Sequence, residues 1–164
     1  MSNELVSPTT ETIREACEAS YTHLRAALDR LTDPLSDMAN DGEWNIRQLL
    51  AHQIGVLFRA PIQAAFYSVV PADGSLPTVP VVISDTFWLK EWEQAPLAAF
   101  RTALDVAYFG NLAFLDKLDA SALSQLGQTP FGPMSLSDLL LGNYQHSIKD
   151  HSAQLETLMS GVVR

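Results

Sequence analysis

The sequence predicts an all-α protein, a four-helix bundle with at least one long crossover connection. The chain has 164 residues, 47% of them apolar, which suits one hydrophobic core and is too short for two. Four long segments repeat apolar residues at the spacing of an amphipathic helix, and none shows strand alternation of useful length. The connections at 70–83 and 119–134 are longer than a plain up-down-up-down bundle needs. We therefore expect residues 1–164 to form one helical domain.

The composition disfavours several classes of partner. The net charge is -9, from 10 basic and 19 acidic residues, whereas nucleic acids and anionic membranes attract basic surfaces. The polar N-terminus lacks the basic start and apolar run of a signal peptide, and no apolar run approaches the roughly 18 residues of a membrane span. We expect a cytoplasmic protein that binds neither nucleic acid nor membrane.

The first helix is predicted over residues 10–31 and ends at Asp33-Pro34. Cys17, the chain's single cysteine, lies in its apolar stripe, so we interpret it as a small buried hydrophobe and not as a nucleophile. His23 lies at the edge of that stripe, where we expect exposure to solvent.

The second helix is predicted over residues 45–69, with a bend at Pro61. Asn45 is a good N-cap, and Gln48, three residues later, can return the hydrogen bond. His52 shares a helix face with apolar residues one turn before and after it. This position predicts that His52 points into the bundle.

A proline-rich connection at 70–83 follows, and then a short helix from residue 84 or 85 to 93. Trp88 and Trp92, four residues apart, favour packing over a role at a pocket mouth. Pro96 suits the first position of a third long helix, predicted over residues 96–118.

The last helix is predicted over residues 136–159, with Ser135 as N-cap and Asp138 three residues on. Ser147 and His151 follow its inner apolar line. His146 belongs to a neighbouring line, because five steps of about 100° place it roughly 140° from His151 on a regular helix. We therefore expect Ser147 and His151 to face His52, with His146 turned aside.

Two inward histidines on facing helices suggest a metal site, since neutral imidazoles bind zinc, nickel or iron well. A histidine inside a helical bundle is also often a hydrogen-bonded core residue. The residues alone leave both interpretations open.

Three stretches resemble the DinB-like superfamily of small bacterial four-helix proteins. WNIRQLLAHQIGV (44–56) is similar to the pattern that supplies the first metal-binding histidine of that family, and DHSAQLETL (150–158) to the closing HxxQ pattern that supplies the third. TPFGPMSLSDLL (129–140) is similar to the loop that leads into the family's last helix. The family includes bacillithiol- and mycothiol-linked transferases and the mycothiol-dependent maleylpyruvate isomerase.

The resemblance implies that His52 and His151 are ligands of a divalent metal, zinc or nickel. The family's middle ligand, usually a histidine, falls on Ser147, which is a poor ligand for such a metal. His146 could replace it through a local wide turn, or a one-residue shift could pair His146 with Asp150. We rank the unshifted arrangement first, so Ser147→His should raise metal affinity and His146→Ala should change it little.

The implied function is a metal-dependent thiol transferase or isomerase that acts on a small electrophile with a low-molecular-weight thiol. The alternative is a non-catalytic, metal-free relative that binds or sequesters a small molecule. The resemblance also implies a homodimer. Large apolar residues in excess of one bundle interior agree with it, namely Phe58, Phe66, Phe87, Trp88 and Phe109.

Overall fold

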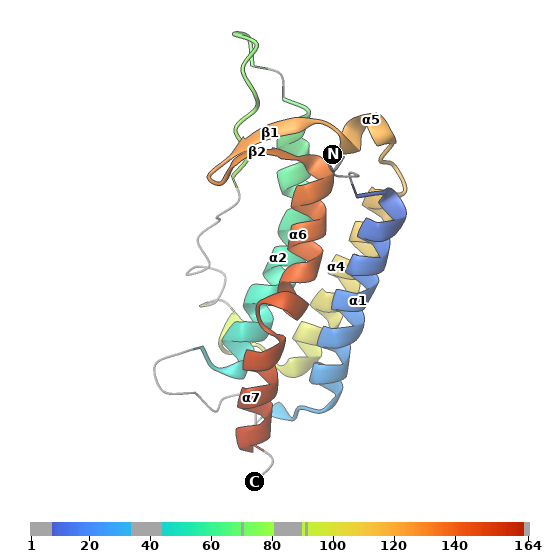
Figure 1. Cartoon of the computed structure of the whole chain (residues 1–164). Helices are drawn as coiled ribbons and strands as arrows, with labels where there is room; N and C mark the ends of the chain where they lie inside the picture. The colour runs from blue at the N-terminus through green and yellow to red at the C-terminus, as the bar shows by residue number, and fades with distance from the viewer. Residues whose placement is uncertain (1–7, 34–43, 70, 81–89, 91, 163–164) are drawn as a thin grey trace, which may run out of the picture.

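The computed structural model describes residues 8–33, 44–69, 71–80, 90 and 92–162 (Figure 1). The bundle is built from four helical units, with α6 and α7 following one another in the last of them. These are α1 (Thr10–Asp29), α2 (Ile46–Tyr67), α4 (Leu97–Leu115), and α6 (Leu136–Lys149) with α7 (Ser152–Val162). A short helix, α5 (Ala120–Leu123), and two strands, β1 (Leu126–Thr129) and β2 (Gly132–Ser135), lie between α4 and α6. The predicted helical bundle is confirmed.

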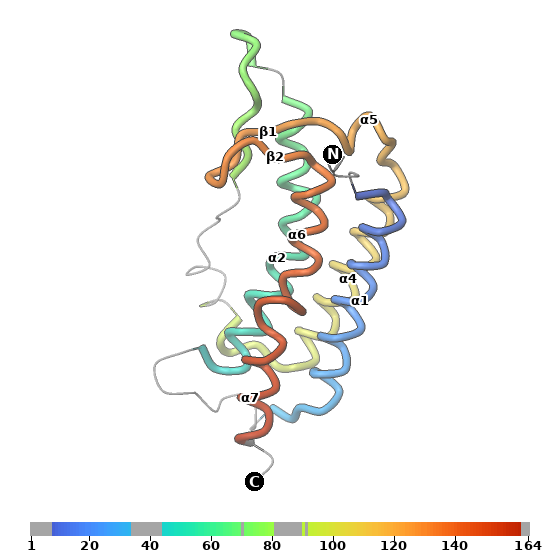
Figure 2. The backbone as a smooth tube through the Cα atoms, in the orientation of Figure 1, coloured from blue at the N-terminus to red at the C-terminus, as the bar shows by residue number. Residues whose placement is uncertain are grey.

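The long crossover lies between α2 and α4. Asn111 of α4 donates to the carbonyl of Leu57 in α2, and Arg47 at the start of α2 donates to the carbonyl of Ala95 just before α4, so these neighbours run parallel. Parallel neighbours require the chain to return from one end of the bundle to the other between them. Figure 2 shows α2 and α4 both running toward the end that carries the strands, as the predicted crossover requires.

The start of α2 follows from its capping residues. The Asn45 side chain accepts a hydrogen bond from the Gln48 N–H at 2.8 Å, and the Asn45 N–H donates to Gln48 Oε1 at 3.0 Å. This reciprocal pair satisfies two backbone N–H donors and fixes the first turn. His52 lies about two turns later and is 9% exposed, which confirms the prediction that it points inward.

The last predicted helix is divided in two, and the continuous helix over residues 136–159 is therefore wrong. The Asp150 N–H donates to the His146 carbonyl at 3.0 Å and closes α6, whereas the His151 carbonyl accepts the first bond of α7, from the Leu155 N–H at 2.9 Å. The junction contains neither proline nor glycine, so the sequence gives no sign of a break there.

The structure also contains a hairpin that the sequence did not predict. Antiparallel pairing runs from Leu126↔Ser135 to Thr129↔Gly132, and strands of four residues are too short for an alternating pattern to show. Gly132 adopts a φ of 107°, a conformation that favours glycine. Tyr67, at the end of α2, donates to the Met134 carbonyl at 3.2 Å and ties the hairpin to the bundle.

Gly127 in β1 is the site of a stability prediction. A Cβ atom there would lie 2.6 Å from Val79 Cγ2 and 2.9 Å from Tyr67 Cε1. We expect Gly127→Ala to lower the free energy of unfolding by about 1–3 kcal/mol in chemical denaturation, because the neighbours must move to admit the methyl group. Gly142→Ala in α6 is the control, since a Cβ there has no atom within 4 Å and alanine favours helix by about 1 kcal/mol. Equal stabilities for the two variants would contradict this packing.

The remaining sequence predictions can be compared with the packing. Cys17 is fully buried, as predicted, and burial raises the pKa of its thiol to about 12. His23 is more buried than predicted, with Nε2 shielded from solvent and its pKa lowered by that burial. Trp92 packs edge-on against Phe100, with ring centroids 4.9 Å apart, as predicted. Trp88 and most of the predicted helix over residues 84–93 lie outside the described residues.

Among the described helices, none combines the length and apolar character needed to cross a membrane.

Candidate metal centre

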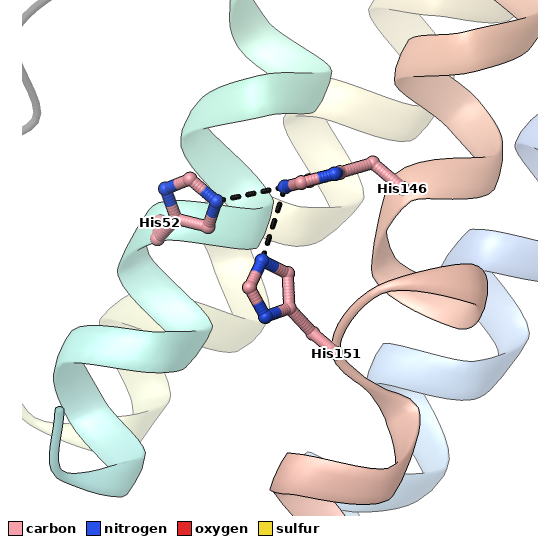
Figure 3. A group of neighbouring side chains, drawn as sticks. All are labelled: His52, His146 and His151. Atoms are coloured by element: carbon pink, nitrogen blue, oxygen red, sulfur yellow. Dashed lines mark hydrogen bonds between the residues drawn. The ribbon is translucent and has the colours of Figure 1, made fainter. Parts of the chain in front are cut away.

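Three of the four histidines meet between α2 and the junction of α6 with α7 (Figure 3). His52 Nε2 lies 2.9 Å from His146 Nε2, and His151 Nε2 lies 3.1 Å from the same atom. One nitrogen from each ring is within 4.8 Å of the other two. The three rings are therefore arranged to share one small central atom.

The break between α6 and α7 brings His146 into this cluster. On a regular helix His146 and His151 would point roughly 140° apart. Because α6 ends at Lys149 and α7 begins at Ser152, the two side chains instead meet with ring centroids 4.6 Å apart and planes at 88°. The expectation that His146 is turned aside is wrong, because the break in the helix lets both rings approach one centre.

The outer nitrogens of two rings have oxygen partners. His146 Nδ1 lies 2.7 Å from Asp150 Oδ2, and His151 Nδ1 lies 2.9 Å from Gln154 Oε1. A carboxylate and an amide oxygen can only accept, so each Nδ1 carries the proton and donates it. In the neutral rings this leaves both Nε2 atoms as bare acceptors that face each other across the centre.

The separations between the imidazole nitrogens show whether a metal ion would fit among them. Two bare acceptors at 3.1 Å repel each other unless a proton or a cation lies between them. Nitrogens bound to zinc at about 2.0–2.1 Å in a tetrahedral site lie about 3.3 Å apart, close to the two separations seen here. Outer partners that hold Nδ1–H and aim Nε2 inward are also the usual support of metal-binding histidines. The donor set fits a divalent metal that prefers imidazole.

Aromatic packing closes one side of the cluster. The Trp44 ring lies 4.6 Å from the His52 ring and 6.2 Å from the His151 ring, measured between centroids. Trp44 is half-buried and packs against the core beside the N-cap of α2. His146 and His151 are also half-buried, so the cluster is enclosed on the Trp44 side while two of its rings keep part of their surface exposed. The sequence shows that Trp44 stands directly before the N-cap, but it does not predict the contact of this ring with the histidines.

Ser147 is excluded from the cluster by its direction. Its side chain is 3% exposed, as predicted, but its hydroxyl lies 2.5 Å from the hydroxyl of Ser20 in α1. It therefore faces α1 and not His52 in α2. Asp150, the carboxylate of the shifted arrangement, contacts the outer nitrogen of His146 and supports that ring from behind.

Comparisons with known proteins agree with this fold. The sequence profile of the DinB superfamily matches residues 16–154. A solved structure, described as "YfiT from Bacillus subtilis is a probable metal-dependent hydrolase with an unusual four-helix bundle topology", superposes with a TM-score of 0.77. The two sequences are 19% identical, and the alignment covers 98% of this chain and 92% of that one. Among proteins with curated descriptions, none matches. Because the profile spans most of the sequence, including all three clustered histidines, the chain belongs to the DinB superfamily.

Proposed function

We propose that this protein is a divalent-metal-dependent enzyme in which His52, His146 and His151 hold zinc or nickel. The observation that carries the proposal is the convergence of three imidazole nitrogens, two of them aimed by oxygen partners behind the rings. The description of YfiT as a probable metal-dependent hydrolase supports a metal at this site in a protein of the same fold.

The chain's own residues would supply three neutral ligands and leave one coordination position for another molecule. When bound, a divalent cation lowers the pKa of a thiol or water beside it and polarises an electrophile. Asp150 and Gln154 would hold the rings in one orientation, and Trp44 would exclude water from one side.

We further propose that the activated group is a low-molecular-weight thiol, and the reaction a transfer or isomerisation on a small electrophile. Cys17 cannot supply the thiol, because it is fully buried and its pKa is raised to about 12. The nucleophile must therefore come from outside the chain. Water in the same position would give hydrolysis, the class named for YfiT.

Metal analysis of protein purified without a histidine tag tests the proposal. We expect one zinc or nickel ion per chain, removed by a strong chelator and regained on addition of the metal. Thiol activation is then tested with Co²⁺ in the site, because a thiolate bound to Co²⁺ adds an intense near-ultraviolet absorption band that water does not. Protein that takes up no metal even at pH 8 would instead support the metal-free, small-molecule-binding alternative.

Asp150 provides a prediction about the support of the site. We expect Asp150→Asn to lower affinity for Zn²⁺ by about 10–100-fold, because the outer hydrogen bond of His146 loses its charge. Competition with a chromophoric chelator measures this affinity. Glu15→Gln, on the exposed face of α1, removes the same charge from the chain and should leave the affinity unchanged. Equal losses in the two variants would point to net charge and not to the hydrogen bond.

We also propose a homodimer formed through the outer face of α4. Val106 is 57% exposed and Phe109 is 61% exposed on that face, whereas Phe58 packs against the core. Phe66 is 37% exposed, and Phe87 and Trp88 lie outside the described residues. A two-fold dimer would bury this uncharged stripe against its copy.

Light scattering should therefore give twice the chain mass of 18.0 kDa at micromolar concentration. Phe109→Asp should convert the dimer into a monomer, because a buried carboxylate without a partner is unfavourable. Phe131→Asp is the control, since Phe131 is 73% exposed on the hairpin and away from α4. A monomeric wild-type protein would refute the dimer.

A further inference from the structure

A second polar contact joins the two helices that carry the histidines. Asn143 of α6 donates through Nδ2 to Gln63 Oε1 in α2 at 2.8 Å, and Gln63 Nε2 donates to the Pro80 carbonyl at 2.9 Å. Gln63 is 1% exposed and Asn143 is half-buried. Like His146, which reaches from α6 toward His52 in Figure 3, Asn143 reaches from α6 toward α2. The two residues therefore share one side of α6.

The position of Asn143 places it next to the cluster. It precedes His146 by three residues, which is about 4.5 Å along the helix axis. On α2, Gln63 follows His52 by eleven positions, so the two lie on almost the same side of that helix and about 16 Å apart along its axis, with Asn143 reaching into the space between them. A molecule that binds beside the three histidines and extends by one helical turn along α6 would meet Asn143.

The contact with Gln63 also fixes which atom Asn143 presents. Because Nδ2 is the donor to Gln63, the carbonyl Oδ1 is directed away from it. Among the described residues, none donates a hydrogen bond to Oδ1. Gln63 is held in turn by Pro80, so the amide of Asn143 is oriented before any ligand arrives. The result is a fixed neutral acceptor at the edge of the site.

We propose that Asn143 is a substrate-contacting residue whose Oδ1 accepts a hydrogen bond from a neutral N–H donor of the bound thiol. The proposal rests on the metal-dependent function proposed above. It narrows the thiol to a class: a small thiol that carries an amide N–H within about 5 Å of its sulfur, the length of one helical turn. A simple alkanethiol, or a thiol with a fully substituted amide, would lack this contact.

Binding of two matched thiols to the Co²⁺-loaded protein tests the proposal. N-methyl-3-mercaptopropionamide carries the N–H, whereas N,N-dimethyl-3-mercaptopropionamide keeps the amide carbonyl and lacks the donor. The thiolate-to-cobalt absorption band reports the binding of each without any turnover. We expect the wild-type protein to bind the N–H probe about 5–10-fold more tightly, the value of one net hydrogen bond.

Variants of Asn143 then test whether this residue causes the preference for the N–H probe. Asn143→Leu should bring the ratio of the two affinities close to one while leaving the affinity for Co²⁺ unchanged, and Asn143→Asp should raise the ratio because a carboxylate is a stronger acceptor. Asn143→Ala, which adds no bulk, replaces the leucine variant if that one does not fold. Gln145→Leu is the matched control, because two residues along α6 turn its side chain about 200° away from Asn143.

The outcomes separate this inference from the function on which it rests. Wild-type protein that takes up no Co²⁺ would refute the metal centre and, with it, the contact. Co²⁺ uptake with equal affinity for the two probes would refute the role of Asn143 alone. A preference that persists in Asn143→Leu would also refute it, because another residue would then be the acceptor.

Discussion

Replacing any one of His52, His146 and His151 with alanine is expected to lower the affinity for Zn²⁺ by about a thousandfold or more. Each variant leaves two imidazoles for an ion that needs at least three protein ligands to be held firmly. The loss should exceed the 10–100-fold change that removal of an outer partner causes. Competition against a chromophoric chelator measures the affinity of each variant.

Stability gives a second measurement of the same prediction. A ligand that binds only the folded state stabilises it by about 2.7 kcal/mol when its concentration is a hundred times the Kd. The wild-type protein should therefore melt at a higher temperature when Zn²⁺ is added, and the three alanine variants should not. His23→Ala is the control, because His23 lies on α1 outside the cluster. A normal metal response in His146→Ala would show that the centre uses a different third group.

Much of the fold could be predicted because its signals are local. The capping pairs of Asn45 with Gln48 and of Ser135 with Asp138 lie where the sequence places them, and both helices begin there. The apolar period also gave the direction of His52, since a side chain two turns from a fixed cap has a fixed direction.

The break between α6 and α7 could not be predicted, because no local signal in the sequence marks it. The apolar period continues through the junction, as Tyr144, Ser147, Leu155 and Leu158 are all buried. The contacts that accompany the break are tertiary or cross the junction: His146 with His52, and His151 with His146 and Gln154. Periodicity describes a regular helix, so it placed His146 aside, whereas the break after Lys149 changes the direction of His146 relative to His151.

Ser147 shows how this local change relates to the family pattern. The resemblance places a histidine at this position, four residues before His151. In this chain the histidine stands one position earlier, and the interruption of the helix restores its approach to His52. At the family's histidine position this chain has Ser147, whose small hydroxyl forms a hydrogen bond with Ser20 in the core. The three-imidazole site and the seam between α1 and α6 are thus compatible in one structure.

Restoring the family residue is therefore expected to harm this protein. Ser147→His places a large ring at a side chain that is 3% exposed and faces Ser20 in α1. Overpacking of a core is unfavourable by about 1–3 kcal/mol, and a buried hydroxyl left without its partner by a similar amount. We expect the free energy of unfolding, measured without metal, to fall by about 2–4 kcal/mol.

Contrary to the expectation from the sequence, the same variant should not bind Zn²⁺ more tightly than the wild-type protein, because the new imidazole points toward α1 and the three existing nitrogens already converge. Ser147→Ala is the matched control. It removes the hydrogen bond without adding bulk, and the difference between the two variants isolates the steric part. A Ser147→His protein that keeps its stability and binds Zn²⁺ at least tenfold more tightly would mean that α6 can rotate to present residue 147 to His52. In that case His146 would be the third metal ligand only because residue 147 is a serine. The break after Lys149 would then be one of two states of the last helix and not a fixed feature of the fold.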